Sequence, residues 1–510
     1  MAILPLLLLL LCSYAPAEAL VRYASSTGAG SAPCTVNANN STACNITTAI
    51  PILVPGDVLI LKNGTYNQRI YPGDFFIPSG TGTGTEAADA PWPNAITIKA
   101  ETTGSVILTG EVYIQDNVNL STVSYLIIEG LIVDRGDNGS SIVERPGPFR
   151  VGAGSHHVRF LNNEGRNTNN HVMLMTSTVH HIHVKGCNHH HAYVTLFDGS
   201  HPTTGMYGIY MNPRDSIVED CQIHDNTGYG IHLFLSGATT VNDNIIRNNF
   251  LYNNGTNDGE RGLTTGGMIV SSGFRNKAYN NVVHNNTGYG IQVSLSAVNN
   301  SEIYYNTVYN NSNSGLMLDV TASNTIVKNN IAYANGLNIQ NDSSSTTFNK
   351  NFCGTSVAGC QFVGNPQFQN APLANFQLQS TSPARGVAEC LGAVPNDILG
   401  VNRPVGLGCD DGPYQFQAAT VGPLVSLPFD EGGGTTANST VGGYVCTLSS
   451  AGWGSPGLIG ASSFSLDGVR YCTIASTPAL RPTTQFTLAG WFKASTTDTG
   501  GGTIVAFPND

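Results

Sequence analysis

Charged side chains are scarce in this sequence. Only 11% of its 510 residues are charged, and 33 acidic residues outnumber 22 basic ones, which gives a formal net charge of −11. Because contacts to phosphates need a basic surface, this balance excludes nucleic acid as the expected partner. Long apolar runs are also lacking beyond the first residues, and none reaches the ~18 residues that a membrane helix needs, so we expect no transmembrane segment.

The residues that are abundant favour strands and turns over helices. The chain contains 58 Gly and 25 Pro, together with runs of Asn, Ser and Thr. These residues are typical of β-structure and tight turns. Hydrophobic residues make up 41% of the chain, enough to bury a large core, and the length predicts more than one domain.

The first nineteen residues have the pattern of a secretory leader. MAILPLLLLLLCSYAPAEA combines an apolar stretch with Ala17-Glu18-Ala19, an A-x-A-like cleavage site. We therefore predict a signal peptide over residues 1–19 and a secreted protein, although the leader has no Lys or Arg before its apolar stretch. A lipoprotein anchor at Cys12 is the alternative, but Leu11 is larger than such a site normally accepts.

Cysteine usage agrees with an oxidising compartment. Removal of the leader takes Cys12 away and leaves ten of the 11 cysteines, an even number that favours disulfides. Proximity in the sequence suggests Cys34 with Cys44, Cys353 with Cys360, Cys390 with Cys409, and Cys446 with Cys472. The sequence alone does not fix this connectivity.

The middle of the chain repeats itself. The stretch HDNTGYGIHLF, from His224, returns as HNNTGYGIQVS, from His284. The segments that align in one register begin at Ile217, Ile245, Lys277, Glu302 and Ile326. One column of this register contains Cys187, Cys221, Asn249, Asn281, Asn306 and Asn330.

Each repeat alternates apolar and polar residues, passes through an Asn-rich turn and resumes as a second short strand. Since so short a unit cannot bury its apolar face alone, we expect the units to stack into an all-β solenoid with like residues about 4.8 Å apart. The Asn column predicts a ladder of hydrogen-bonded amides. Cys187 and Cys221 replace Asn in adjacent units, so they form either a disulfide across two coils or a buried free pair.

These repeats resemble the secreted right-handed parallel β-helix proteins of the pectate-lyase-like superfamily, over residues 20–418. VPGDVLILKNGTYNQRI, AITIKAETTGSVILTG and SYLIIEGLIVDRG are similar to the opening coils of that superfamily, and LGCDDGPYQF is similar to its closing segment. The resemblance implies a right-handed solenoid and leaves the reaction open, because one fold hosts many functions.

The periodic Asn disappears after about Val421. Residues 419–510, with SFSLDGVRYCTIAS and FTLAGWFKAS, resemble the first half of a laminin-G-like, concanavalin-type β-sandwich, or jelly roll. Such a sandwich needs more strands than this segment supplies. We therefore expect it to be incomplete at its C-terminus and the chain to be a fragment of a longer one.

Two outward-facing columns identify a candidate groove. Two residues before the ladder the column reads Lys185, Glu219, Arg247, Tyr279, Tyr304 and Lys328; three residues after it the column reads His190, His224, Tyr252, His284, Tyr309 and Tyr333. Sugars bind to aromatic rings flanked by charged groups. We predict catalytic roles for Lys185, Glu219, His224 and Arg247, and substrate contacts from His190, Tyr252, Tyr279, His284 and Tyr304.

Two long turns support a groove at these columns, whereas a surface ion-pair ladder would explain the charged residues without one. The turns through AYVTLFDGSHPTTGM and GTNDGERGLTT are longer than their neighbours at the same point of the coil, and insertions in solenoids collect on the functional face. Alternatively, Lys185, Glu219 and Arg247 form a surface ion-pair ladder worth less than about 1 kcal/mol per pair.

Two metal sites are open possibilities. His181, His183 and His190 offer imidazoles for zinc, but their spacing matches no closed zinc motif. Asp215, Glu219 and Asp220 offer oxygens for calcium, and a solvated acidic turn explains them equally. We leave the metal open, with calcium as a possible cofactor.

The function therefore has two candidate classes. The first is a polysaccharide lyase or epimerase that acts on an acidic polysaccharide: a cation neutralises the uronate carboxylate and a base removes the C5 proton. The Asp, His and Arg-Lys motifs of polygalacturonases are absent from the solenoid, and Asp410-Asp411 lies in the closing segment. The paired Lys and Arg motifs of alginate and chondroitin lyases are missing too. The second class is a non-catalytic scaffold that binds cell-surface glycans.

Overall fold

The computed structural model separates into two compact units, Met1–Phe416 and Gln417–Asp510. The described residues are 19–39, 41–109, 117–136, 147–193, 206–234, 241–255, 265–294, 298–404, 408–417, 427–441, 443–450, 452–454, 463–464 and 472–474. The predicted signal peptide lies almost wholly outside them. In the described part of the chain, no helix has the length and apolar character that a bilayer crossing requires.

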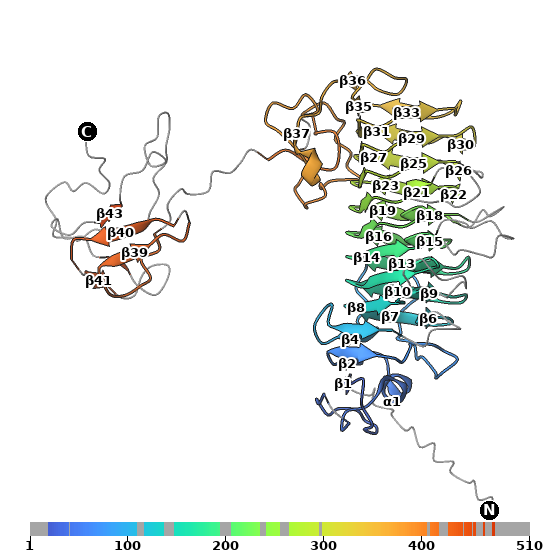
Figure 1. Ribbon diagram of the computed structural model, residues 1–510, viewed down its shortest axis with the longest axis vertical. Coiled ribbons are helices and arrows are strands. Elements are labelled where there is room, and N and C mark those ends of the chain that lie inside the picture. The colour runs from blue at the N-terminus through green and yellow to red at the C-terminus, as the bar shows by residue number, and fades with distance from the viewer. Residues whose placement is uncertain are drawn as a thin grey trace, which may run out of the picture. The chain divides into compact units, whose positions relative to one another are not determined.

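The first unit is a parallel β-helix with three long sheets of 12, 12 and 9 strands, in which the central coils contribute one strand to each sheet (Figure 1). Sheet A consists of β1 (Val21–Ala24), β2 (Val58–Leu61), β4 (Ile96–Ala100), β7 (Ser124–Glu129), β10 (His156–Leu161), β13 (His180–Lys185), β16 (Ile217–Glu219), β19 (Ile245–Arg247), β23 (Lys277–Tyr279), β27 (Glu302–Tyr304), β31 (Ile326–Lys328) and β34 (Thr347–Asn349).

Sheet B consists of β3 (Gly64–Tyr66), β5 (Val106–Leu108), β8 (Leu131–Asp134), β11 (Glu164–Thr168), β14 (Asn188–Ala192), β17 (Gln222–His224), β20 (Phe250–Tyr252), β24 (Val282–His284), β28 (Thr307–Tyr309), β32 (Ile331–Tyr333), β35 (Phe352–Cys353) and β36 (Phe362–Val363). Sheet C consists of β6 (Val118–Leu120), β9 (Phe149–Val151), β12 (Met173–Met175), β15 (Ile209–Met211), β18 (Ile231–Leu233), β21 (Gly266–Val270), β25 (Tyr289–Val293), β29 (Ser314–Leu318) and β33 (Leu337–Asn341). A smaller parallel sheet contains β22 (Gly273–Phe274), β26 (Val298–Asn299) and β30 (Ala322–Ser323).

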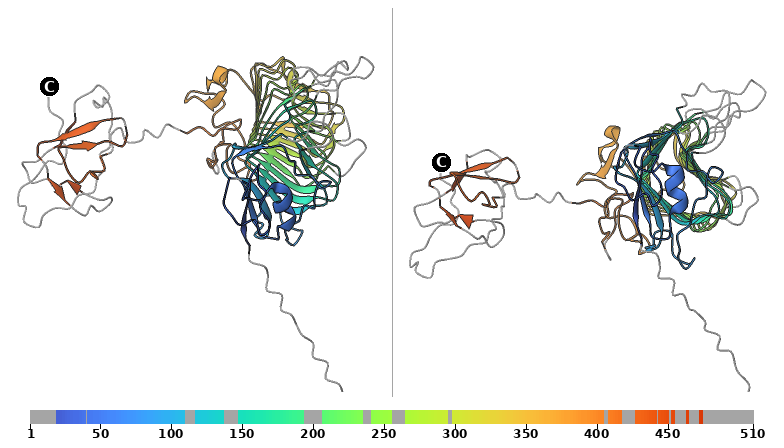
Figure 2. Two further views of the ribbon diagram at one scale, coloured as in Figure 1. Left: turned by 60° about the horizontal axis from the view of Figure 1, so that its bottom comes forward. Right: turned by 90° about the horizontal axis from the view of Figure 1, so that it is seen from below.

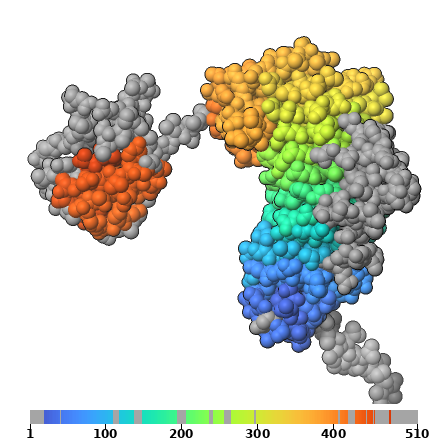
Figure 3. Space-filling model, viewed as in Figure 1, coloured from blue at the N-terminus to red at the C-terminus, as the bar shows by residue number. Residues whose placement is uncertain are grey.

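The core lies inside the coil, between the three sheets. Alternate residues of each strand point inward, so that Val184, Val218 and Ile246 of neighbouring sheet A strands stack one strand apart and are buried. The coils follow one another in sequence order along the unit (Figure 3). One continuous apolar cluster runs from Ala24 to Cys353.

Both ends of the apolar core are covered. At the N-terminal end, the short helix α1 (Ile46–Ala49), followed by the 3-10 turn Ile50–Ile52, lies across the first coil and buries Ile46 and Ala49 (Figure 2). Asn45 caps this helix because its Oδ1 accepts from Thr48 N at 2.9 Å. Such caps keep the stacked sheets from exposing apolar surface.

At the C-terminal end, Phe348, Val357 and Cys360 pack against the core, and residues 364–417, called here the closing segment, follow. It contains the antiparallel hairpin of β37 (Phe368–Asn370) and β38 (Asn375–Leu378), joined by the 3-10 turn Ala371–Leu373. Phe368 and Phe376 pack on the outer face of sheet B against Val282 and Ile331. The closing segment therefore covers the outside of the last coils.

The predicted Asn column is confirmed as a buried ladder between sheets A and B. Asn249, Asn281, Asn306 and Asn330 each donate from Nδ2 to the Oδ1 of the next member at 3.0 Å. The same amides donate to strand carbonyls, for example Asn281 to Ile246 O at 2.8 Å. The residue before each member has positive φ, a conformation that Asn and Asp tolerate best, which explains the Asn pairs in the sequence.

A second ladder, which the sequence analysis missed, follows sheet B. It contains Asn226, Asn254, Asn286, Asn311 and Asn335, with Nδ2 to Oδ1 distances of 2.8–3.1 Å. Its members come five residues after those of the first ladder, so the same alignment contained the signal.

The disulfides expected from proximity are present. They join Cys34–Cys44, Cys353–Cys360, Cys390–Cys409 and Cys446–Cys472. Of the two alternatives for Cys187 and Cys221, the structure has the disulfide across two coils, with the Cα atoms 4.5 Å apart. This bridge replaces one step of the Asn ladder with a covalent bond.

The second unit contains small antiparallel sheets. One has β39 (Thr436–Asn438), β40 (Val445–Leu448) and β43 (Cys472–Ile474), and the other has β41 (Trp453–Gly454) and β42 (Ser463–Phe464). Most of FTLAGWFKAS and its surroundings lies outside the described residues. The predicted jelly-roll sandwich stays a prediction.

Candidate functional site

The predicted column on sheet A is confirmed in register, and it forms an ion-pair cluster around Glu219. Lys185, Glu219 and Arg247 are direct neighbours on β13, β16 and β19. Glu219 Oε1 accepts from Lys185 Nζ at 2.9 Å and lies 3.0 Å from His183 Nε2, while Glu219 Oε2 accepts from Arg247 Nε at 2.6 Å. The Glu219 side chain is only 5% exposed. We call these four residues the Glu219 cluster.

Electrostatics fix the protonation of the Glu219 cluster. Burial alone would raise the pKa of Glu219, but hydrogen bonds from His183, Lys185 and Arg247 outweigh it and hold that pKa well below its usual range. Burial is likewise outweighed at Lys185, by bonds to Glu219 and Asp220, and at Arg247, by the Tyr279 hydroxyl and then Glu219, so the pKa of both is raised. None of the three exchanges a proton near neutral pH, so the geometry favours a structural role, and their predicted catalytic role stays a prediction.

The predicted tyrosines of the same column lie in two environments. Arg247 Nη1 donates to the Tyr279 hydroxyl at 3.1 Å, so Tyr279 extends the Glu219 cluster. Tyr304 is 8% exposed because it packs in one apolar cluster with Ala388, Leu391 and Val394 of the closing segment. Its predicted contact with substrate stays a prediction that this burial disfavours.

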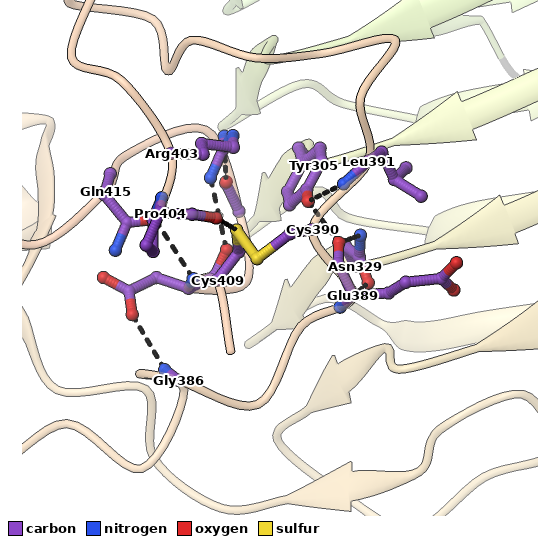
Figure 4. The surroundings of a disulfide bond; sticks show 12 residues. Tyr305, Asn329, Gly386, Glu389, Cys390, Leu391, Arg403, Pro404, Cys409 and Gln415 are labelled. Carbon is purple, nitrogen blue, oxygen red and sulfur yellow. Dashed lines mark hydrogen bonds between the residues drawn. A yellow bond between two sulfur atoms is a disulfide. The ribbon is translucent and has the colours of Figure 1, made fainter. Parts of the chain in front are cut away.

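The closing segment has an internal disulfide, Cys390–Cys409, and is held on these coils by hydrogen bonds around it (Figure 4). Asn329 Nδ2 donates to Glu389 O at 2.8 Å, and Asn329 Oδ1 accepts from Glu389 N at 3.0 Å. The Tyr305 hydroxyl donates to the same carbonyl, and the Arg403 guanidinium lies 3.7 Å from the centre of the Tyr305 ring. The cover over Tyr304 is therefore anchored and not a loose flap.

The first four members of the predicted column on sheet B form a continuous stack of rings. His190 and His224 have centroids 4.8 Å apart at 8°, His224 and Tyr252 4.7 Å at 5°, and Tyr252 and His284 5.2 Å at 15°. We call these four residues the sheet B stack. His284 is 5% exposed under Phe376, 5.2 Å away, so the open part of the stack runs from His190 to Tyr252.

His224 has acceptors on both sides of its ring. Nδ1 lies 2.6 Å from Asp225 Oδ2, and Nε2 lies 3.0 Å from Asn188 Oδ1. The hydrogen bond with His224 holds the pKa of Asp225 below its usual range, so Asp225 is an ionised acceptor. An imidazole oriented in this way can donate a proton from Nε2 and regain it, as general acid–base catalysis requires. Among the described residues, no hydrogen bond or ion pair joins His224 to the Glu219 cluster, which faces outward from sheet A.

A charged group that the sequence analysis missed continues the sheet B column upstream. Arg166 is one strand before His190 in register, and its Nε donates to Asp134 Oδ2 at 2.8 Å. Its Nη1 donates to Glu164 Oε1 at 2.5 Å, and His190 Nε2 lies 3.3 Å from the same oxygen. Asn163 occupies the ladder position of this coil, so extension of the alignment by one repeat would have found Arg166 three residues later.

A second missed group lies on the outer face of sheet C, and we call it the sheet C cluster: Tyr207, Tyr210, Tyr229 and His232. The His232 ring lies 4.7 Å from Tyr207, 5.1 Å from Tyr210 and 5.4 Å from Tyr229. His232 is 7% exposed, neither ring nitrogen has a hydrogen-bond partner in the described part of the chain, and burial lowers its pKa to about 3. Most of the two predicted long turns, residues 194–205 and 256–264, lies outside the described residues.

The structure does not bring the predicted metal ligands together. His183 contacts Glu219 on sheet A, His190 lies on sheet B, and His181 lies at the start of β13 beside His157 and His180. Asp215 precedes β16 and pairs with Arg214, whereas Asp220 follows β16 and pairs with Lys185 at 3.1 Å. The predicted zinc and calcium sets are therefore separated, and each of these carboxylates faces a cation.

Comparison with known proteins identifies the solenoid. Residues 151–330 match the family model described as "Right handed beta helix region", so the solenoid is a right-handed parallel β-helix. The solved structure of a pectate lyase, Pel9A, is similar with a TM-score of 0.55 and 14% identity, over 78% of this chain and 96% of its own. At that identity the likeness shows the fold alone.

Two further solved structures are more distant. A rhamnogalacturonan lyase has a TM-score of 0.46 at 16% identity, over 71% of this chain and 95% of its own. The A-module of the mannuronan C-5 epimerase AlgE6 from Azotobacter vinelandii has a TM-score of 0.42 at 16% identity, over 61% of this chain and 87% of its own. No curated protein sequence matches this chain.

Proposed function

We propose that this protein is a lyase or C5 epimerase of an acidic polysaccharide and that the sugar chain lies along the sheet B stack. The observation that carries the proposal is His224, oriented by Asp225 within an open row of stacked rings. Stacked rings offer apolar faces to sugar rings, and the imidazole offers a proton donor and acceptor. The shared fold with a pectate lyase supports a uronate polymer as the substrate class.

The candidate cation for the uronate carboxylate is Arg166 in the same column, which also pairs with Asp134 and Glu164. Hydrogen bonds and charge from Asp134 and Glu164 outweigh burial and raise the pKa of Arg166, so it stays positively charged. Two strand spacings, about 10 Å, separate its position from that of His224. His190 and Tyr252, on either side of His224, are proposed as sugar contacts, as is Tyr279 at the edge of the Glu219 cluster.

Activity on uronate polymers tests the proposal. Protein lacking residues 1–19 is incubated with pectate, alginate, hyaluronan or chondroitin in the presence of calcium. Ultraviolet absorbance detects the unsaturated uronate that a lyase releases, and NMR detects inversion at C5 by an epimerase. We expect activity on one polymer, and a loss of about 10²–10⁴-fold in His224→Ala, the usual contribution of an acid–base group.

Two further variants locate the site. Asp243→Asn, in the exposed ion pair with Arg275, is the matched control and should keep full activity. Full activity in His224→Ala, with a loss in His232→Gln, would contradict the sheet B site and place the chemistry on sheet C. The absence of any product from all four polymers would contradict the enzymatic proposal for those substrates.

One observation favours the second function, a glycan-binding scaffold. A surface pocket of about 350 Å³ lies between sheet B and the closing segment, lined by aromatic rings and carboxamides without any charged side chain. Its lining includes Tyr309, Tyr333, Gln367, Gln369, Asn370 and Gln379. Such a lining fits an uncharged sugar. Binding of neutral oligosaccharides that is lost in Gln369→Ala would support the scaffold function.

Secretion is part of the proposal. Four disulfides in the first unit and one in the second are the pattern of proteins from oxidising compartments. Extracellular polysaccharides are accessible to such a protein. The predicted signal peptide over residues 1–19 has the same implication.

A further inference from the structure

Four histidines at the start of two adjacent sheet A strands form a compact imidazole group. His156 and His157 are the first two residues of β10, and His180 and His181 are the first two of β13, with His156 and His180 paired in register. The His156 and His180 rings stack at 5.0 Å and 2°, and the His157 and His181 rings stack at 4.6 Å and 6°. We call these residues the histidine quartet.

The nitrogen atoms of the histidine quartet converge. His156 Nδ1 lies 2.8 Å from His157 Nδ1, and His180 Nδ1 lies 2.7 Å from His181 Nδ1. One nitrogen from each of His157, His180 and His181 can be chosen so that all three lie within 4.8 Å of one another. Stacking along a column explains parallel rings, but it does not require nitrogens to face one another in both coils.

Hydrogen bonding fixes the tautomer of His157 and directs its Nδ1 lone pair at His156 Nδ1. His157 Nε2 lies 2.9 Å from the carbonyl oxygen of Glu86, and a carbonyl only accepts, so Nε2 carries the proton of the neutral ring. Nδ1 is then unprotonated and faces His156. This arrangement, in which the second nitrogen donates to a backbone carbonyl, is how metal-binding histidines are usually oriented.

The charged groups beside the quartet compensate each other. Arg214 and Asp215, which face His180 and His181, pair with each other. A metal ion at the quartet therefore meets no uncompensated positive charge from this pair.

We propose that His157, His180 and His181 bind one divalent transition-metal ion, with zinc as the test ion and His156 in position for a fourth bond. Zn–N bonds of about 2.0–2.1 Å place the nitrogens of a tetrahedral site ~3.4 Å apart. Because the chosen nitrogens of His157, His180 and His181 already lie within 4.8 Å of one another, the ion needs only a small approach of the three rings. Imidazole suits zinc, copper or nickel, whereas calcium requires oxygen ligands.

The site has a structural consequence. Glu86 belongs to the segment 79–95, which covers this end of sheet A: Arg159 Nε donates to Ala88 O at 3.0 Å and its guanidinium lies 3.6 Å from the Trp92 ring centre. A metal ion in the quartet would bridge the coils of β10 and β13. It would also fix His157, whose Nε2 bonds to Glu86 O of this segment. Bound metal therefore raises the midpoint of thermal unfolding.

The test begins with unmodified protein after chelator treatment. We expect calorimetric titration with zinc to show one site per chain, and a tenfold excess of calcium not to compete. X-ray absorption of the zinc-loaded protein should show at least three imidazole nitrogens at about 2.0–2.1 Å. Coordination dominated by oxygen, or fewer than three imidazoles, would overturn the proposal, and this readout does not depend on any variant.

Matched variants locate the ion. His157, His181 and His191 all have φ between 53° and 57°, a conformation that Asn accepts, so the same substitution can be made at each. His157→Asn and His181→Asn should weaken zinc binding by at least about 100-fold, more than loss of an outer-shell contact. His191→Asn should leave it unchanged. Unaltered binding in the first two variants, or equal loss in the third, would contradict the site.

Discussion

At the scale of single residues, His189 shows what a polar side chain costs inside the coil. It points inward from β14, is fully buried, and neither ring nitrogen has a hydrogen-bond partner among the described residues. Burial lowers its pKa to about 3, so the ring is neutral. We predict that His189→Leu raises the free energy of unfolding by about 1–3 kcal/mol, the cost of unpaired buried polar groups. Urea unfolding at pH 7 measures this; a lower free energy of unfolding would show that the imidazole has an essential partner.

Glu219 is an example of what sequence could not decide. The register of Lys185, Glu219 and Arg247 followed from the repeat, because alternation and strand spacing place them in one row. Their protonation did not follow, because it depends on His183 and on burial to 5% exposure. Burial and neighbouring charges decide whether the groups of a charged row can exchange protons, and therefore whether the row is a structural ladder or a catalytic centre.

At the scale of elements, the Asn ladder is expected to be the most sensitive part of the coils. Asn281→Ala would leave Asn249 N without its side-chain acceptor and Ile246 O without its side-chain donor, while Asn249 Nδ2 keeps only its bond to Val218 O. We predict a loss of at least about 2 kcal/mol, since each unpaired buried group costs about 1–3 kcal/mol. Asn341→Ala, at an exposed position of β33, should change stability by about 0.5 kcal/mol or less. Equal effects in urea unfolding would contradict the role of the ladder.

The repeat predicts the columns of side chains along the sheets but not the segments that cover them. The columns from His190 to Tyr333 were predictable because each coil repeats a local pattern. The burial of His284 and Tyr304 was not, because the closing segment that covers them is distant in sequence and has no period. The sheet C cluster was missed for a related reason: its strands follow turns of unequal length, which break the alignment.

At the scale of the whole molecule, buried neutral histidines predict sensitivity to acid. The pKa values of His189 and His232 are lowered to about 3 and that of His284 to about 4 by burial, compared with ~6.5 in the unfolded chain. Between pH 6.5 and 4 the unfolded chain binds protons that the folded chain does not. The free energy of unfolding therefore falls as the pH falls through this window.

Thermal unfolding of metal-free protein from pH 7.5 to pH 4.5 measures this acid sensitivity. We expect the midpoint to decrease steeply below pH 6.5, and His189→Leu to show a smaller decrease than the unmodified protein. A midpoint that is constant over this range would contradict the burial of neutral imidazoles.

The central claim concerns where a sugar chain binds, and a crystal structure with an acidic oligosaccharide tests it most directly. Crystals of the protein lacking residues 1–19 would be soaked with the uronate oligomer that gives activity or, failing activity, with each of the four in turn. The account predicts electron density for sugar rings over His190, His224 and Tyr252, with a uronate carboxylate toward Arg166. Density over Tyr210 and His232, or in the pocket at Tyr333 and Gln369, would contradict it.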